Sequence, residues 1–126
     1  MDIGRLKNNE QYCAWWPERE VVLSLKENPE FNLRIWDGYF AEIFEDAIFT
    51  DEPWVGFTRD YQEGKGCWEK ESEIKNIDEY IWDMLRYKGK EYDPIWARHI
   101  PEVFNLIIDF LTYAKQTNQT VVVELQ

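Results

Sequence analysis

The sequence predicts an α+β fold, with a small mixed or antiparallel sheet of about four to five strands and about three or four helices packed on it. Short β-branched or alternating apolar runs near both ends of the chain predict strands, and apolar residues at helical spacing between them predict helices. The 126 residues are 44% hydrophobic and contain no internal repeat, low-complexity tract or linker. Residues 1–126 are therefore expected to form a single globular domain.

A β-hairpin is expected near the start of the chain. Residues 20–25 are rich in β-branched side chains, Asn28-Pro29 is a turn signal, and apolar residues alternate with polar ones from 31 to 35. Two such runs around a proline-containing loop are typical of a hairpin. The preceding segment ends in Trp15, Trp16 and Pro17, and we expect it to form an anchoring loop or short helix that closes one end of the core.

The next helix is expected to begin with Asp37 as its N-cap and to stop at Pro53. Its apolar face would hold five residues, which are Phe40, Ile43, Phe44, Ala47 and Ile48. The alternation from Trp54 to Tyr61 then predicts a strand. A glycine-containing turn follows, and Cys67-Trp68 with the next residues would return as an antiparallel strand.

Three further helices and a last strand complete the prediction. Residues 73–88 show a buried stripe of Ile74, Ile77, Ile81, Met84 and Leu85. Asp93-Pro94 predicts the start of a short helix, with Asp at the N-cap. Residues 102–117 are apolar around most of their circumference, as in a central core helix. The run TVVVEL at 120–125 has no alternation, which indicates an inner strand.

The charge balance excludes several classes of function. The chain has 25 acidic and 14 basic residues, with a formal net charge of −11. Proteins that bind nucleic acid or anionic membranes need clustered Lys and Arg, so neither partner is expected. No apolar run approaches the roughly 18 residues of a membrane span, and the N-terminus resembles no secretory signal. We therefore expect a cytoplasmic protein.

Motifs that carry chemistry are missing from the sequence. His99 is the single histidine, and it is expected at the edge of the core. Cys13 and Cys67 lie far apart and are expected to be free thiols. Neither a phosphate-binding glycine loop, a G-x-S-x-G elbow nor an EF-hand spacing occurs. We expect no enzyme activity, no catalytic residue, no cofactor and no metal site.

Negative charge and aromatic residues concentrate together in one segment. Between Asp37 and Gly64 there are eight acids and one base, Arg59, which is −7 of the net −11. Trp82 lies outside the apolar stripe of its helix, so either a neighbouring loop covers it or it is an exposed contact residue. Acids beside bulky rings indicate a surface that binds a basic protein. The residues predicted to bind this partner are Asp37, Glu42, Glu45, Asp46, Phe49, Asp51, Glu52, Trp54, Tyr61, Glu63 and Trp82.

In size, charge and the segments DGYFAEIFED and FTDEPW, the chain resembles immunity proteins of bacterial contact-dependent growth inhibition and related polymorphic toxin systems. The resemblance implies a small cytoplasmic antitoxin without an active site. It would inhibit a cognate toxin, with a nuclease domain as the expected target, by covering the cationic surface of that domain.

Three alternatives stay open. The first is a secretion chaperone or scaffold subunit that holds a client in an apolar groove. The second is a DNA mimic that inhibits a nucleic-acid-binding protein through carboxylates at phosphate-like spacing. The third is an enzyme that uses carboxylates with raised pKa values in a concave pocket.

Overall fold

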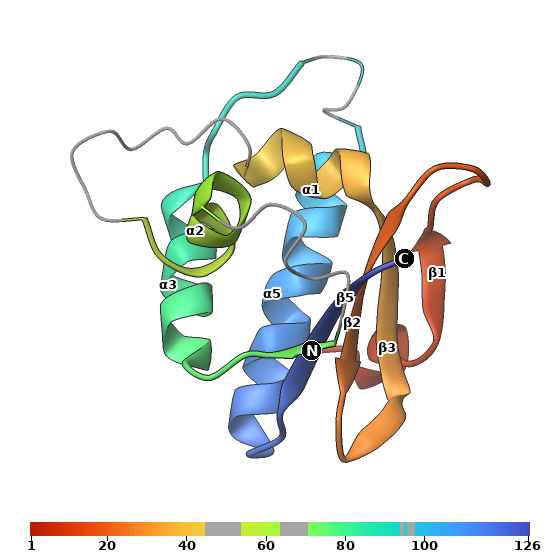
Figure 1. Ribbon diagram of the computed structural model, residues 1–126, viewed down its shortest axis with the longest axis vertical. Coiled ribbons are helices and arrows are strands. Elements are labelled where there is room, and N and C mark those ends of the chain that lie inside the picture. Colours follow the sequence, from red (N-terminus) through yellow and green to blue (C-terminus); the bar gives the residue numbers. More distant parts are fainter. Residues whose placement is uncertain (45–53, 64–70, 94, 96–97) are drawn as a thin grey trace.

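The computed structural model describes residues 1–44, 54–63, 71–93, 95 and 98–126, and it has the predicted α+β fold (Figure 1). A five-stranded mixed sheet has the order β1-β3-β2-β5-β4. The strands are β1 (Asn9–Tyr12), β2 (Glu20–Leu25), β3 (Asn28–Trp36), β4 (Ser72–Glu73) and β5 (Val121–Leu125). The helices are the short 3-10 helix η1 (Ile3–Leu6) and the α-helices α1 (Asp37–Phe44), α2 (Gly56–Glu63), α3 (Ile77–Arg86) and α5 (Ile100–Gln116).

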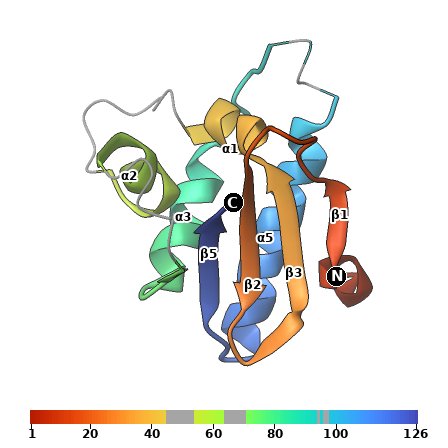
Figure 2. The ribbon, with the colours of Figure 1, turned by 45° about the vertical axis from the view of Figure 1, so that its right-hand side comes forward.

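The predicted hairpin is confirmed. Strands β2 and β3 pair antiparallel, with Val21 opposite Ile35 and Leu23 opposite Leu33. These four side chains are buried, so the alternating residues of the two strands meet on one face of the sheet. Helix α5 runs along that face, with α3 beside it and α2 packed against α3 (Figures 1 and 2).

The segment before the hairpin differs from the expectation. Residues 9–12 form strand β1, which pairs in parallel with β3. Tyr12 is buried at the end of this strand, whereas Trp15 and Trp16 are 87% and 94% exposed. The prediction that the two tryptophans close the core is therefore wrong. Tyr12 already fills the core at that point, and the chain then leaves the sheet in a loop of residues 13–19 that carries both indoles outward.

The last strand is an inner one, as predicted. Strand β5 pairs antiparallel with β2 on one side and with the two-residue strand β4 on the other. Val121, Val122 and Val123 are all buried, which explains the missing alternation. The return strand was expected at residues 67–71, and strand β4 lies directly after them, at Ser72–Glu73. Cys67 and Trp68 lie outside the described residues.

Helix α1 begins at Asp37 as predicted and buries Phe40, Ile43 and Phe44. Ala47 and Ile48 of the predicted apolar face lie outside the described residues. The predicted strand from Trp54 to Tyr61 is wrong, because residues 56–63 form helix α2. Phe57 and Tyr61 are four residues apart, so the apolar spacing that suggested a strand also suits one face of a helix.

Helix α3 is shorter than predicted, and its stripe is shifted. Ile74 is buried just before the helix starts, and Leu85 is half exposed rather than buried. Asp83 takes the inward position instead, through bonds to α2 described below. Helix α5 is confirmed as the central helix, and the residues that it buries are Ile100, Val103, Leu106, Ile107, Phe110, Leu111 and Ala114. No helix in the described part of the chain is long and apolar enough to cross a membrane.

Candidate functional site

Five of the eleven predicted partner-binding residues lie outside the described residues. They are Glu45, Asp46, Phe49, Asp51 and Glu52. The other six fall on three helices and the segment before α2, and the structure gives them different roles.

Asp37 and Tyr61 are bound to each other. The hydroxyl of Tyr61 donates to Oδ1 of Asp37 at 2.8 Å, and its ring stacks on Phe44 with centroids 6.1 Å apart. Tyr61 is only 6% exposed. The pair ties α2 to the first turn of α1, so Tyr61 presents almost no surface to a partner, contrary to the expectation.

The remaining four residues lie at or near the surface. Glu42 is partly buried, while Glu63 and Trp54 are exposed at the two ends of the α2 region. Trp82 is 49% exposed on α3, with the guanidinium of Arg86 4.4 Å from its ring centroid. Of the two alternatives for Trp82, the structure therefore supports the exposed one.

The most exposed tryptophans in the described part of the chain are Trp15 and Trp16, which were not among the predicted site residues. A hydrogen bond of 2.8 Å from the backbone N–H of Glu18 to the carbonyl of Trp15 turns the loop that holds them. Glu20 steadies the loop, since its carboxylate accepts from the N–H of Ala14 at 3.3 Å and from Arg34 at 2.6 Å. The sequence signal that could have identified them as exposed is that the two adjacent tryptophans belong to no apolar periodicity.

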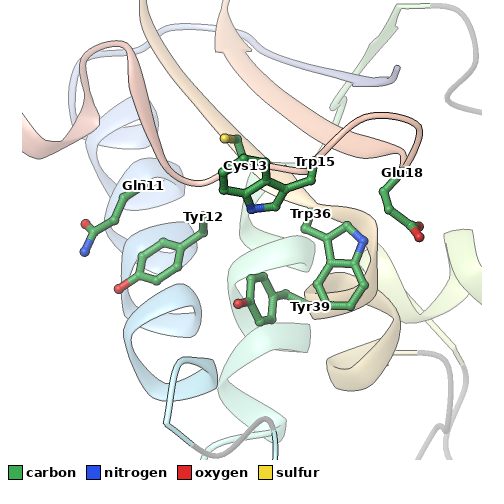
Figure 3. Close-up of a pocket in the computed structure, with 7 residues that line it drawn as sticks. All are labelled: Gln11, Tyr12, Cys13, Trp15, Glu18, Trp36 and Tyr39. Atoms are coloured by element: carbon green, nitrogen blue, oxygen red, sulfur yellow. The ribbon is translucent and has the colours of Figure 1, made fainter.

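Beside Trp15 lies a pocket of about 310 Å³ that is open to the surface. Figure 3 shows the rings of Trp15, Trp36 and Tyr39 grouped together, with Tyr12 beside them and Glu18 at one rim. The lining comes from the end of β1, the loop of residues 13–19, the end of β3 and the first turn of α1. The lining residues are Gln11, Tyr12, Cys13, Trp15, Glu18, Trp36 and Tyr39.

Three of the rings that line the pocket, those of Tyr12, Trp36 and Tyr39, are held in place by contacts with one another and with His99. Trp36 and Tyr39 meet edge to face with centroids 5.2 Å apart, and Tyr39 meets Tyr12 in the same way at 6.1 Å. His99 contacts both tyrosines at 6.0 and 6.1 Å, which confirms its expected place at the edge of the core. Edge-to-face pairs of this kind add stability beyond the area that they bury.

Gly38 allows Trp36 to take its position. A Cβ atom at Gly38 would lie 2.5 Å from two carbons of the Trp36 ring, closer than any real contact. The indole can therefore lie across the start of α1 only because residue 38 has no side chain. The sequence Trp36-Asp37-Gly38-Tyr39 thus builds one wall of the pocket at the point where strand becomes helix.

The electrostatics of the pocket favour positive charge. Glu18 is the one acid among the seven lining residues, and none of these seven described residues is Lys or Arg. The hydroxyl of Tyr12 donates to Oε2 of Glu102 on α5. Burial, and then this carboxylate, raise the pKa of Tyr12 to about 12, and burial raises the pKa of Tyr39 as well. Both phenols therefore stay neutral at physiological pH.

A second hollow of about 230 Å³ lies on the other side of the same loop. It is lined by Ala14, Trp16, Glu18, Glu20 and Gln126. Glu18 is common to both hollows, so the loop presents one indole to each of them beside a shared carboxylate. A third hollow, of about 280 Å³, is lined by Lys88 and Lys90 and has the opposite charge. Lys90 donates to the carbonyls of Glu42 and Ile43 at 2.9 and 3.1 Å, so it holds the end of α1.

The described residues bring together no group of three His, Cys, Asp or Glu side chains that could hold a metal ion. Cys13 is a free thiol, as expected, whereas Cys67 lies outside the described residues. What the pocket offers is ring faces, neutral hydroxyls and a carboxylate, which suits the binding of an organic cation or an amphipathic side chain.

Comparison with protein-family models, curated proteins and solved structures finds no match to this chain.

Proposed function

We propose that this protein is an acidic binding module that neutralises a basic protein partner. In this proposal it is an immunity protein, and the partner is a cognate toxin with a cationic, nuclease-type domain. The protein would act by covering the surface with which that domain holds phosphates. It needs no reaction of its own for this purpose.

One observation carries the proposal: two adjacent tryptophans, 87% and 94% exposed, lie on a chain with a formal net charge of −11. Exposed indoles are costly on a monomer, and Trp is enriched among the residues that dominate interface energies. Excess negative charge steers a basic partner toward such a surface and accelerates association. In this proposal the negative charge makes association with the basic partner fast and selective, and the tryptophan rings form the contact from which water is excluded.

The pocket adjoins the acidic segment along the chain. Trp36 and Tyr39 flank Asp37, which is the first acid of that segment and the first residue of α1. A partner bound at the loop of residues 13–19 would therefore also meet the beginning of α1. We propose that the partner binds at this junction and that the acids that follow it in the sequence, from Glu42 to Glu52, add to the attraction.

The first experiment is a growth assay with charge reversal. Cells that express the cognate toxin domain should survive when the protein is co-expressed. The variant Glu42→Lys, Glu45→Lys, Asp46→Lys should slow association of the purified pair at least about tenfold, because steering depends on local charge. Loss of protection in the growth assay should accompany the slower association.

The matched control is Glu30→Lys, Glu71→Lys, Asp78→Lys. It changes the net charge by the same amount at three exposed acids outside the proposed surface. This control should keep protection, and both variants should unfold at the temperature of the unchanged protein within a few degrees. If the toxin domain kills cells regardless of this protein, or if the two triple variants behave alike, the proposal is wrong.

A further inference from the structure

We infer that the pocket lined by Trp15, Trp36, Tyr39 and Glu18 binds one cationic side chain, lysine or arginine, of the basic partner. The inference rests on the proposed function and goes further, because it assigns a particular chemical group to a particular cavity. The occupant is a side chain of a protein, and the experiment separates it from a neutral side chain that has the carbon chain of lysine without the ammonium group.

Size is the first argument. The pocket encloses about 310 Å³, at the lower end of the roughly 300–1,000 Å³ of small-molecule sites. Such a space suits a single long side chain better than a cofactor. The pocket is also open to the surface beside the exposed Trp15, so a side chain from a docked protein could enter it.

The chemistry of the walls is the second argument. Aromatic rings carry negative charge on their faces and attract ammonium and guanidinium groups, with Trp the strongest of the three ring types. Trp15, Trp36 and Tyr39 supply three such rings, and Glu18 adds a formal charge at the rim (Figure 3). Tyr12 is kept neutral by its burial and by its hydrogen bond to Glu102. The positive charge of an occupant would therefore meet rings, a neutral phenol and a carboxylate.

The position of nearby cations is the third argument. Arg19 belongs to the same loop but does not line the pocket, and its guanidinium donates to the carbonyl of Leu125 at 3.5 Å. Arg34 is paired with Glu20. The hollow lined by Lys88 and Lys90 shows that a cavity of similar size elsewhere in this protein has the opposite character. The charge of the aromatic pocket is thus complementary to a basic partner.

The test uses three small probes, Nα-acetyl-arginine methylamide, its lysine analogue and its neutral norleucine analogue. The indole N–H resonances of the protein, assigned by Trp→Phe variants, report where each probe binds. The two cationic probes should shift Trp15 and Trp36 saturably, with dissociation constants of about millimolar size. Trp54 and Trp82 should not shift. Norleucine should bind at least about fivefold more weakly, because it lacks the cation–π and carboxylate contacts.

Two substitutions and one control variant sharpen the assignment. Glu18→Gln should weaken the cationic probes about three- to tenfold and leave the norleucine probe unchanged, because only the cations use the carboxylate. Glu71→Gln removes the same charge from an exposed residue just before β4 and should change neither. Trp15→Ala should weaken the binding reported by Trp36 about two- to fivefold, the loss of one exposed cation–π contact. It should not lower the unfolding temperature, since Trp15 is almost fully exposed.

Equal binding of norleucine would overturn the inference in favour of an apolar pocket. Equal shifts at Trp15, Trp36, Trp54 and Trp82 would overturn it in favour of general attraction to an acidic protein. Failure of the inference and failure of the proposed function can be told apart. If the probes do not bind the pocket but the protein still protects cells, only the inference falls. If the probes bind as expected and no protection occurs, the immunity function falls and the cation site stands.

Discussion

At the scale of single residues, Asp83 is the buried charge on which two helices depend. Its carboxylate accepts from the N–H of Thr58 at 2.9 Å, from the Thr58 hydroxyl at 2.8 Å and from Arg86 at 2.6 Å. Because the hydroxyl proton of Thr58 is donated to Asp83, the hydroxyl of Tyr87 acts as the donor in its 2.6 Å hydrogen bond to the Thr58 oxygen. Asp83 is fully buried, and each of these bonds compensates part of the cost of desolvating it.

Asp83→Ala should therefore destabilise the protein by about 3–5 kcal/mol, because Arg86 would be left without its carboxylate in a nearly buried position. Denaturant unfolding followed by circular dichroism measures the change. The control is Asp78→Ala, at an exposed residue that is also on α3. It removes an ion pair with Lys115 of α5 and should cost less than about 1 kcal/mol. Similar costs for the two variants would show that the Asp83 network is not a stabilising contact.

At the scale of elements, the contact between α2 and α3 depends on a glycine. Gly56 begins α2 with φ of +57°, and a Cβ there would lie 2.9 Å from Cβ of Asp83 and 3.2 Å from Cα of Tyr80. The backbone conformation and the close approach both exclude a side chain. This glycine explains why residues 56–63 can pack as a helix against α3, where alternation alone suggested a strand.

Gly56→Ala and Gly89→Ala form a matched pair that separates the two effects. Gly89 also has positive φ, at +90°, but its surroundings within 4 Å are open. Gly89→Ala should cost about 1–2 kcal/mol from backbone strain alone. Gly56→Ala should cost about 1–3 kcal/mol more, because the methyl group would also overpack the α2–α3 contact. Equal losses in denaturant unfolding would mean that the helices separate easily at this point.

At the scale of the whole molecule, several buried tyrosines link the fold to alkaline pH. Burial raises the pKa of Tyr92 to about 12, and burial together with Glu102 raises that of Tyr12 to about 12. Burial also raises the pKa of Tyr80 and Tyr87. In the unfolded chain these phenols ionise near their ordinary pKa of about 10. Between these pH values the native state binds more protons than the unfolded state.

Stability should therefore be unaffected by these phenols below about pH 10 and should fall as the pH rises toward about 12. The measurement is the free energy of unfolding at intervals between pH 8 and pH 12. Tyr12→Phe removes one of the linked protons, so its stability should fall less steeply over the upper part of this range. A slope that matches the unchanged protein would show that Tyr12 does not contribute.

At the same scale, the net charge and the exposed indoles contribute to the proposed function in different ways. Net charge acts over the distance at which a partner approaches, and it is screened beyond about 8 Å at physiological salt. The exposed indoles act only on contact. A surface that combines an acidic segment with the loop of residues 13–19 can therefore bind both quickly and with a dry centre.

Much of the fold could be predicted from local patterns. The hairpin, the start of α1 at Asp37, the central helix α5 and the inner strand β5 all follow from apolar periodicity and turn residues, which are properties of neighbouring residues in the chain. The wrong predictions arise where a local pattern fits more than one structure. The segment from Trp54 to Tyr61 fits two periods over so few residues, and the choice between them depends on Asp83 and Tyr80, about 25 residues further on.

The candidate site was harder to predict than the fold. Composition identified an acidic chain rich in aromatic residues, and that property depends on no coordinates. Which rings are exposed was decided by the tertiary structure: Tyr61 is buried and bound to Asp37, while Trp15 and Trp16 project from a loop.

By itself, the sequence determined the fold class, most of the helices and strands and the strongly negative charge, because each depends on residue type and on short-range order. Only the tertiary structure decided that Trp15, Trp36, Tyr39 and Glu18 share one pocket. The reason is physical: β1 pairs in parallel with β3, so the end of β1 and the start of α1 lie together although more than 20 residues separate them in the chain. Periodicity carries no information about such a meeting.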